Sequence, residues 1–424
     1  MTKVIHFQEE FLKRISKLVK GYDEGRIVFD KYLDQSLKNK TRLIRSKSSA
    51  EYAVHPDMSL TMSIKDLLSA SSTKRRLTIM LAEATLDHFI KQRQIRIIVV
   101  YDDKIRKSES PDQIEFHTHE EADTLIPQQV LDCQNEYAAL DIPLEISVDS
   151  PDTDVLTLNL HLDAQGHLKE STKLLFITRK KIKNSSRRIV DIRERVKVLG
   201  TEKSKALIGF HNFTGADWGG KFNRVSKQKW CDAFMKLPDD SPVLKVFSCL
   251  GEIDIPSELD EDKLPADVAA LEEFVCNVYS ENGPKTLSEL RWELFRAKNS
   301  EGEMLPPTLG ALLPHTIRAN FISRRDKSYT AVRPLLPPIE ENGWNLQDGV
   351  YTPIMCTLLP APKAVIELTK CGCKKTACIG NCNCFKNTLP CTPMCKCNVE
   401  MCQNSTVSSS NPHTTDSDEE DNYD

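Results

Sequence analysis

The stretch "CGCKKTACIGNCNCFKNTLPCTPMCKCNVEMC", from Cys371 to Cys402, contains nine of the 14 cysteines of this 424-residue chain. It includes three Cys-x-Cys pairs, at positions 371/373, 382/384 and 395/397. Disulfides, a single zinc finger and a cluster of several zinc ions could each explain so many thiols. Disulfide pairing would leave one thiol over because nine is an odd number, and one finger with four ligands would leave five thiols unused.

A cluster of about three zinc ions uses all nine thiols. Three tetrahedral ions need roughly twelve ligand positions, and nine thiolates supply them when three of the nine bridge two ions each. A Cys-x-Cys pair suits this arrangement because it places two sulfur atoms within reach of adjacent ions. The predicted zinc ligands are Cys371, Cys373, Cys378, Cys382, Cys384, Cys391, Cys395, Cys397 and Cys402.

The composition indicates which cellular compartment and which kinds of partner to expect for the chain. The first residues, "MTKVIHFQEEFLKR", contain no apolar signal region, so we expect no secretory signal and a reducing compartment. No apolar run approaches the length of a membrane span, so we expect no membrane partner. The chain has 57 basic and 61 acidic residues, a net charge of −4, so any surface that binds nucleic acid must be local.

The order of hydrophobic patterns predicts several regions. Apolar strand patterns alternate with helical patterns up to about residue 201, which is typical of an α/β domain with a mainly parallel sheet. Later patterns are helical, then rich in proline, and the last residues are rich in serine and acidic residues. We predict an α/β domain (1–235), a helical extension (236–304), a Pro-rich connector (305–370), a zinc module (371–404) and a disordered acidic tail (405–424).

Acidic residues form the second group of interest. Several follow predicted strands or begin predicted helices, and the carboxyl ends of parallel strands meet at one edge of a sheet. Clustered carboxylates can hold two magnesium or manganese ions, roughly 4 Å apart, for phosphodiester hydrolysis. Each carboxylate could instead cap a helix N-terminus. The candidate metal ligands are Asp30, Glu121, Asp123, Asp152, Asp154 and Asp217.

The cysteine stretch resembles the tesmin-type CXC domain over residues 371–402, and Asn404 follows it as an Asn often does in that family. The resemblance implies a zinc-stabilised module that contacts DNA. Lys374 and Lys375 match the basic pair of the family. Asn381 stands where tesmin-type domains have a Tyr that enters the DNA minor groove, and the gaps before Cys382 and Cys402 differ from the usual spacing.

The module carries two further lysines in positions that suit phosphate contact. With the basic pair they give the predicted DNA-binding residues Lys374, Lys375, Lys386 and Lys396. The alternative is a zinc-stabilised module that contacts only protein and does not bind DNA.

The acidic motifs resemble the flap-endonuclease branch of the PIN-like nucleases over about residues 7–235. "VFDKY" with the basic "SLKNKTRLIR" is similar to the strand-ending Asp and arch segment of that family, and "EAD" at 121–123 to its helix start. "DTDVL" at 152–156 and "GAD" at 215–217 are similar to its acidic corner and its duplex-gripping element. The resemblance implies a parallel sheet and a two-metal nuclease site.

This chain departs from the nuclease pattern in two important ways. The family begins with a strand that carries a metal-binding Asp, and this chain begins after the point where that strand would lie. Pro127 falls inside the helix that follows Glu121, where a proline kinks or breaks a helix. Both departures favour an incomplete nuclease site.

The combination of a nuclease-like region, a helical and Pro-rich middle and a cysteine stretch also resembles a set of uncharacterised animal proteins associated with mobile elements. We therefore expect a nuclear DNA-binding protein derived from a mobile element, with a zinc module and a degenerate nuclease domain. The alternatives are an active magnesium-dependent structure-specific nuclease and a protein-interaction scaffold that does not bind DNA.

Overall fold

The computed structural model describes residues 3–33, 36–37, 51–68, 70–140, 142–179, 187–216, 220–258, 264–298, 305–356, 371–374, 378–392, 395–398 and 401–405. Among the predicted features, Asp217, Lys375, the basic segment 38–45, connector residues 357–370 and tail residues 406–424 lie outside these ranges. Two compact units are found. The larger contains Met1–Leu290 with Leu309–Met355, and the smaller contains Arg291–Thr308 with Cys356–Asp424.

The larger unit contains a four-stranded sheet in the order β1-β2-β3-β4. β1 and β2 are parallel, whereas β3 and β4 follow as antiparallel neighbours. The four strands are β1 (Glu24–Val28), β2 (Arg96–Tyr101), β3 (Lys104–Lys107) and β4 (Ser110–Phe116).

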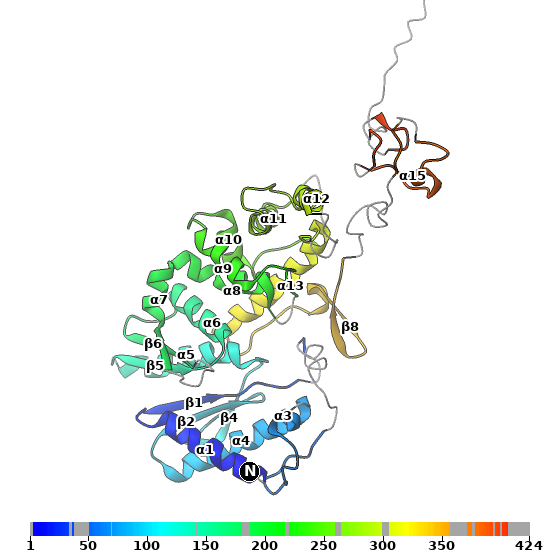
Figure 1. Ribbon diagram of the computed structural model, residues 1–424. Coiled ribbons are helices and arrows are strands. Elements are labelled where there is room, and N and C mark those ends of the chain that lie inside the picture. The colour runs from blue at the N-terminus through cyan, green and yellow to red at the C-terminus, as the bar shows by residue number, and fades with distance from the viewer. Residues whose placement is uncertain are drawn as a thin grey trace, which may run out of the picture. The chain divides into compact units, whose positions relative to one another are not determined.

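Strand β2, with the sequence RIIVVY, is buried on both faces because successive side chains of a strand point to opposite sides. Ile97 and Val99 pack with the helix α4 (Ser71–Gln92), while Ile98 and Val100 pack with Leu125 on the other face. The helix α1 (Val4–Val19) lies beside α4 (Figure 1). The continuous β-branched run is thus explained by two covered faces.

A second sheet has three strands in the order β5-β6-β7, with β5 and β6 parallel and β7 antiparallel to β6. Its core includes Val148, Leu174 and Phe176, packed against Leu158 of the helix α6. A separate hairpin pairs β8 with β9. These elements are β5 (Leu144–Asp149), β6 (Thr172–Arg179), β7 (Arg187–Asp191), α6 (Thr153–Ala164), β8 (Trp344–Gln347) and β9 (Val350–Pro353).

The predicted α/β fold is confirmed, but the predicted mainly parallel sheet is not, because antiparallel pairs outnumber parallel ones among the described strands. In the described residues the strands form small mixed sheets, and parallel pairing is limited to β1 with β2 and β5 with β6. The helix α5 (Ala122–Tyr137) contacts both β1 and β5. It continues through Pro127, which is buried inside it, so the carbonyl of Asp123 lacks the N–H that a residue other than proline would offer.

The rest of the larger unit is mainly helical and has an aromatic core. Phe210 stacks on Phe234 with 4.2 Å between ring centroids, and Phe247 packs edge-on against Phe210. α10 and α11, from the predicted helical extension, join this core. The helices are α7 (Ile192–Leu199), α8 (Thr201–Gly215), α9 (Lys227–Lys236), α10 (Pro242–Cys249), α11 (Ala266–Tyr279) and α13 (Leu309–Lys327). The helix α12 (Leu287–Lys298) begins in the larger unit, and its residues from Arg291 onward belong to the smaller one.

Short elements complete the described chain. Among the residues that the structure describes, no helix is both long and apolar enough to cross a membrane. The smaller unit has the short helix α15 within its cysteine-rich part. The short elements are α3 (Ile64–Leu67), η1 (Ala138–Leu140), η4 (Ser328–Thr330), η5 (Glu340–Asn342) and α15 (Asn383–Lys386).

Candidate metal centres

The nine cysteines from Cys371 to Cys402 form the core of their module. Eight of them are buried, and Cys373 is half-buried against the other eight. Apolar side chains normally fill such a core, but here the described cluster consists of thiols. Such a concentration of thiols in one core is compatible with a bound metal ion.

The distances between sulfur atoms match those expected around zinc. Sγ of Cys371 lies 3.9 Å from Cys378, 4.0 Å from Cys391 and 3.8 Å from Cys397, while Cys382 and Cys391 are 3.9 Å apart. Four sulfur atoms bound to one ion at about 2.3 Å lie roughly 3.8 Å apart, whereas a disulfide joins its atoms at about 2.05 Å. All nine are free thiols, so the donor set fits zinc and does not form disulfides here.

The thiols form overlapping groups of four. In each group the sulfur atoms lie within 4.8 Å of one another. Cys371 and Cys391 each belong to three groups, so no single set of four ligands stands apart from the rest. The groups are 371/373/378/382, 371/391/395/397, 371/382/384/391 and 378/391/397/402.

Backbone contacts close the module around the thiols. Asn404 accepts a hydrogen bond at its carbonyl from the backbone N–H of Cys391, and its side-chain amide donates to the carbonyl of Leu389 at 3.0 Å. The same amide lies 3.5 Å from Sγ of Cys391. Asn404 therefore joins the end of the module to its middle, next to a thiol shared by three groups.

Burial also controls how these thiols ionise in the absence of metal. It raises the pKa of Cys384 and of Cys397 to about 12. Thiolate is the form that binds zinc, so metal binding must displace protons from these side chains.

Lys374, Lys386 and Lys396 are exposed on the surface of the module. Lys375, the second member of the predicted basic pair, lies outside the described residues. Asn381 is exposed as well. The described lysines thus place positive charge on the outside of the thiol cluster.

A carboxylate pocket lies in the larger unit. Carboxylate oxygens of Asp123, Asp152 and Asp154 all lie within 4.8 Å of one another. Asp123 is in the first turn of α5, and Asp154 is in the first turn of α6. Asp152 is the N-cap of α6 and accepts a hydrogen bond from the backbone N–H of Asp154 at 3.0 Å. The partial positive charges of two helix N-termini therefore favour these carboxylates.

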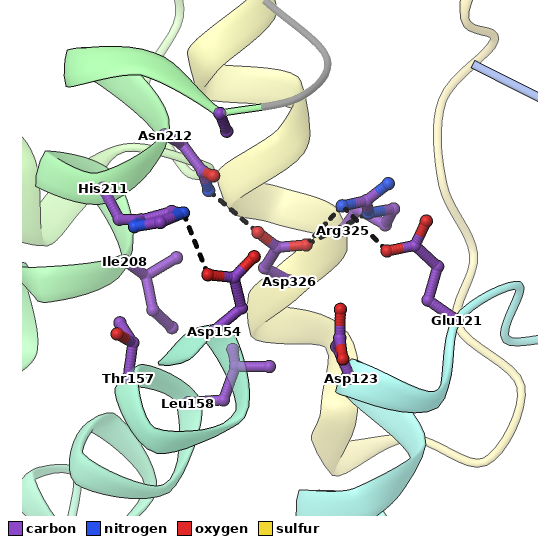
Figure 2. A pocket seen from close by; sticks show the side chains of 11 residues that line it. Glu121, Asp123, Asp154, Thr157, Leu158, Ile208, His211, Asn212, Arg325 and Asp326 are labelled. Atoms are coloured by element: carbon purple, nitrogen blue, oxygen red, sulfur yellow. Dashed lines mark hydrogen bonds and ion pairs between the residues drawn. The ribbon is translucent and has the colours of Figure 1, made fainter. Parts of the chain in front are cut away.

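The opposite wall of the pocket comes from α8 and α13 (Figure 2). His211 Nε2 lies 3.3 Å from a carboxylate oxygen of Asp154. The side-chain amide of Asn212 donates to Asp326 at 2.9 Å. Burial lowers the pKa of His211 although the carboxylate of Asp154 opposes this, which favours a neutral imidazole.

Arg325 supplies a positive charge inside the pocket. Its guanidinium lies 2.8 Å from a carboxylate oxygen of Asp326 and 4.0 Å from one of Glu121 (Figure 2). Burial by itself would lower the pKa of Arg325, but the carboxylates of Asp326 and Glu121 raise it above its ordinary value. The residue is therefore a permanent cation between two acidic side chains.

The structure brings together part of the predicted acidic set. Carboxylates of Asp123, Asp152 and Asp154 form one group, and neither Asp30 nor Glu121 belongs to it. Asp30 is exposed and accepts a hydrogen bond from the backbone N–H of Ala122 at 3.0 Å, which is a capping contact. Glu121 lines the pocket beside Arg325.

Sequence reasoning missed His211, Asn212, Arg325 and Asp326, and Asp217 lies outside the described residues. The "RRDK" at the end of α13 follows the acidic motifs by about 170 residues, so no spacing connects it to them.

Comparison of the chain with protein-family models, with curated proteins and with solved structures finds no match. The nine-thiol cluster itself is compatible with zinc binding.

Proposed function

We propose that this chain is a nuclear DNA-binding protein in which a three-zinc cysteine module contacts the phosphate backbone. The observation that carries the proposal is the cluster of nine thiols at zinc-like spacing, with three exposed lysines around it. The origin in a mobile element rests on the sequence resemblance alone.

The overlapping groups support one distribution of three ions. The first ion takes Cys371, Cys373, Cys378 and Cys382, and the second takes Cys378, Cys391, Cys397 and Cys402. Cys384 and Cys395, whose sulfur atoms are 3.5 Å apart, remain for the third ion. Cys391 completes it together with either Cys371 or Cys382, which lie 4.0 Å and 3.9 Å from Cys391. Cys378, Cys391 and either Cys371 or Cys382 are bridging thiolates in this arrangement.

The lysines provide the contact with DNA. The chain as a whole is acidic, so binding to a polyanion requires a local positive surface. Lys374, Lys386 and Lys396 are exposed on a module that metal would hold rigid. Ammonium groups on such a module can neutralise phosphates and release counterions, which gives an affinity that falls steeply with salt.

The experiment measures binding of the zinc-loaded chain to a labelled duplex by fluorescence anisotropy at several salt concentrations. Replacing Lys374, Lys386 and Lys396 together by alanine should weaken binding and reduce the salt slope by about three, because each phosphate contact contributes roughly 0.9. The control replaces Lys13, Lys197 and Lys285, which are exposed and lie outside the module. Equal affinity in the two triple variants would favour the scaffold alternative.

We infer that the carboxylate pocket is a degenerate nuclease site. Two-metal hydrolysis needs two cations positioned on the attacking and leaving oxygens. In this pocket Arg325 lies 2.8 Å from Asp326 and 4.0 Å from Glu121 and balances part of their charge, which leaves Asp123, Asp152 and Asp154 as ligands for one cation. We therefore expect the chain to cleave flap or gapped DNA very slowly or not at all.

The second candidate function is an active nuclease, and the convergence of Asp123, Asp152 and Asp154 favours it. The test is cleavage of a labelled flap substrate with magnesium or manganese, beside a variant with Asp152→Asn and Asp154→Asn. Strong cleavage that this variant abolishes would establish the nuclease and end the degenerate-site interpretation. Weak cleavage of equal rate in both proteins would indicate a contaminating enzyme.

A further inference from the structure

Residues 332–338, with the sequence VRPLLPP, form a segment outside the helices and strands that we call the proline strap. It lies in the larger unit, after η4 and before η5. Its N-terminal part is tied to β4, and its C-terminal end makes a local contact with η5. Nε of Arg333 donates to the carbonyl of Phe116 at 3.1 Å, and the side-chain amide of Asn342 donates to the carbonyl of Pro338 at 2.7 Å.

Covalent structure restricts the backbone of the strap. Pro334, Pro337 and Pro338 have a fixed φ, and a residue before proline avoids the helical region. Between residues 333 and 338 only Leu335 is free of both restrictions. Such a sequence favours the polyproline II conformation, which has about three residues per turn.

The exposure of the strap follows a repeat of three. Pro334 and Pro337 are half-buried, so one edge of the strap faces the body of the unit. Leu335 is 94% exposed, and Val332 and Leu336 are 39% and 37% exposed. Single exposed aliphatic residues are common on proteins. Three of them within five residues of one short segment are a concentration of exposed aliphatic side chains.

We propose that the proline strap is a docking segment for a protein domain that binds polyproline II helices in a groove lined by aromatic side chains. Such grooves take an extended ligand whose conformation is already restricted, so little conformational entropy is lost on binding. Glu340 and Glu341 follow the strap and are exposed. The matching groove therefore carries basic side chains at the end that receives the C-terminal part of the strap. This inference does not depend on DNA binding or on zinc.

The test uses the purified zinc-loaded full chain and two immobilised panels of isolated domains, one of SH3 domains and one of WW domains, with biolayer interferometry as the readout. At least one domain with a basic groove rim should bind. Replacing Leu335 and Leu336 together by alanine should lower that affinity at least about tenfold. A matched control replaces Leu140 and Val198, which are 58% and 76% exposed in the same unit, and should bind like the wild type.

Three results would overturn the proposal. The first is that no domain of either panel binds the chain. The second is that the Leu335→Ala, Leu336→Ala variant binds as tightly as the wild type. The third is that the chain self-associates through the strap and that this variant abolishes the self-association. A synthetic peptide of residues 330–342 should compete with the full chain, which shows that the strap itself occupies the groove. Zinc content and thermal midpoint should be equal in wild type and variants, which excludes a folding defect.

Discussion

The cysteine module and the carboxylate pocket both gather groups that carry negative charge when ionised, yet they differ in what balances that charge. In the module the described lysines are exposed, and the buried core consists of thiols. In the pocket the guanidinium of Arg325 lies between Glu121 and Asp326. Clustered buried charges need partners or a metal. The module is therefore expected to depend on bound metal, whereas the pocket contains part of its own counter-charge.

The largest expected effect is a difference in zinc loss between bridging cysteines, which bind two ions each, and terminal cysteines, which bind one ion each. Cys391→Ser removes a ligand that two ions share, so elemental analysis should show a loss of about two of roughly three zinc ions and unfolding of the module. Cys373→Ser, at a terminal position, should cost about one ion. The control is Cys276→Ser, a buried cysteine outside the module, which should leave zinc content unchanged. Equal zinc loss for Cys391→Ser and Cys373→Ser would contradict the proposed distribution.

The next effect concerns the charge inside the pocket. Arg325→Met leaves Glu121 and Asp326 without this cation and should lower the stability of the larger unit by about 3–5 kcal/mol, measured as a fall in its thermal midpoint. Added manganese should restore part of the loss, because the freed carboxylates can then hold a second cation.

Arg324→Met is the matched control because Arg324 is the exposed neighbour of Arg325 on α13. It should change the midpoint little. If both variants melted at the wild-type temperature, Arg325 would not be the counter-charge of the pocket, and the contrast with the module would disappear.

The smallest effect separates the two roles of Asp152. Asp152→Asn keeps a side-chain oxygen for the N-cap of α6, whereas Asp152→Ala removes it and should cost about 1 kcal/mol. Both variants lose the negative charge and should bind manganese more weakly in a calorimetric titration. Unchanged manganese binding in Asp152→Asn would mean that Asp152 is only a cap.

The sequence was informative where the relevant contacts are local. The alternating patterns predicted an α/β fold, which the structure confirms, and a mainly parallel sheet, which it does not. The cysteine spacing predicted a cluster that is compatible with zinc. Pro127 suggested a disturbed helix, yet α5 continues through it, and Pro127 is among the buried residues of the helix. Local propensity therefore did not decide that position.

The cysteine module was predicted from the sequence itself, since nine thiols fall within 32 residues of the chain and thiolate is a good ligand for zinc. The carboxylate pocket was decided only by the tertiary structure. Its residues come from α5, α6, α8 and α13, between positions 121 and 326. Packing of α13 against α8 brings Arg325 and Asp326 to the acidic helix starts. No short-range pattern encodes such a contact, because it arises from burial of apolar helix faces far apart in the chain.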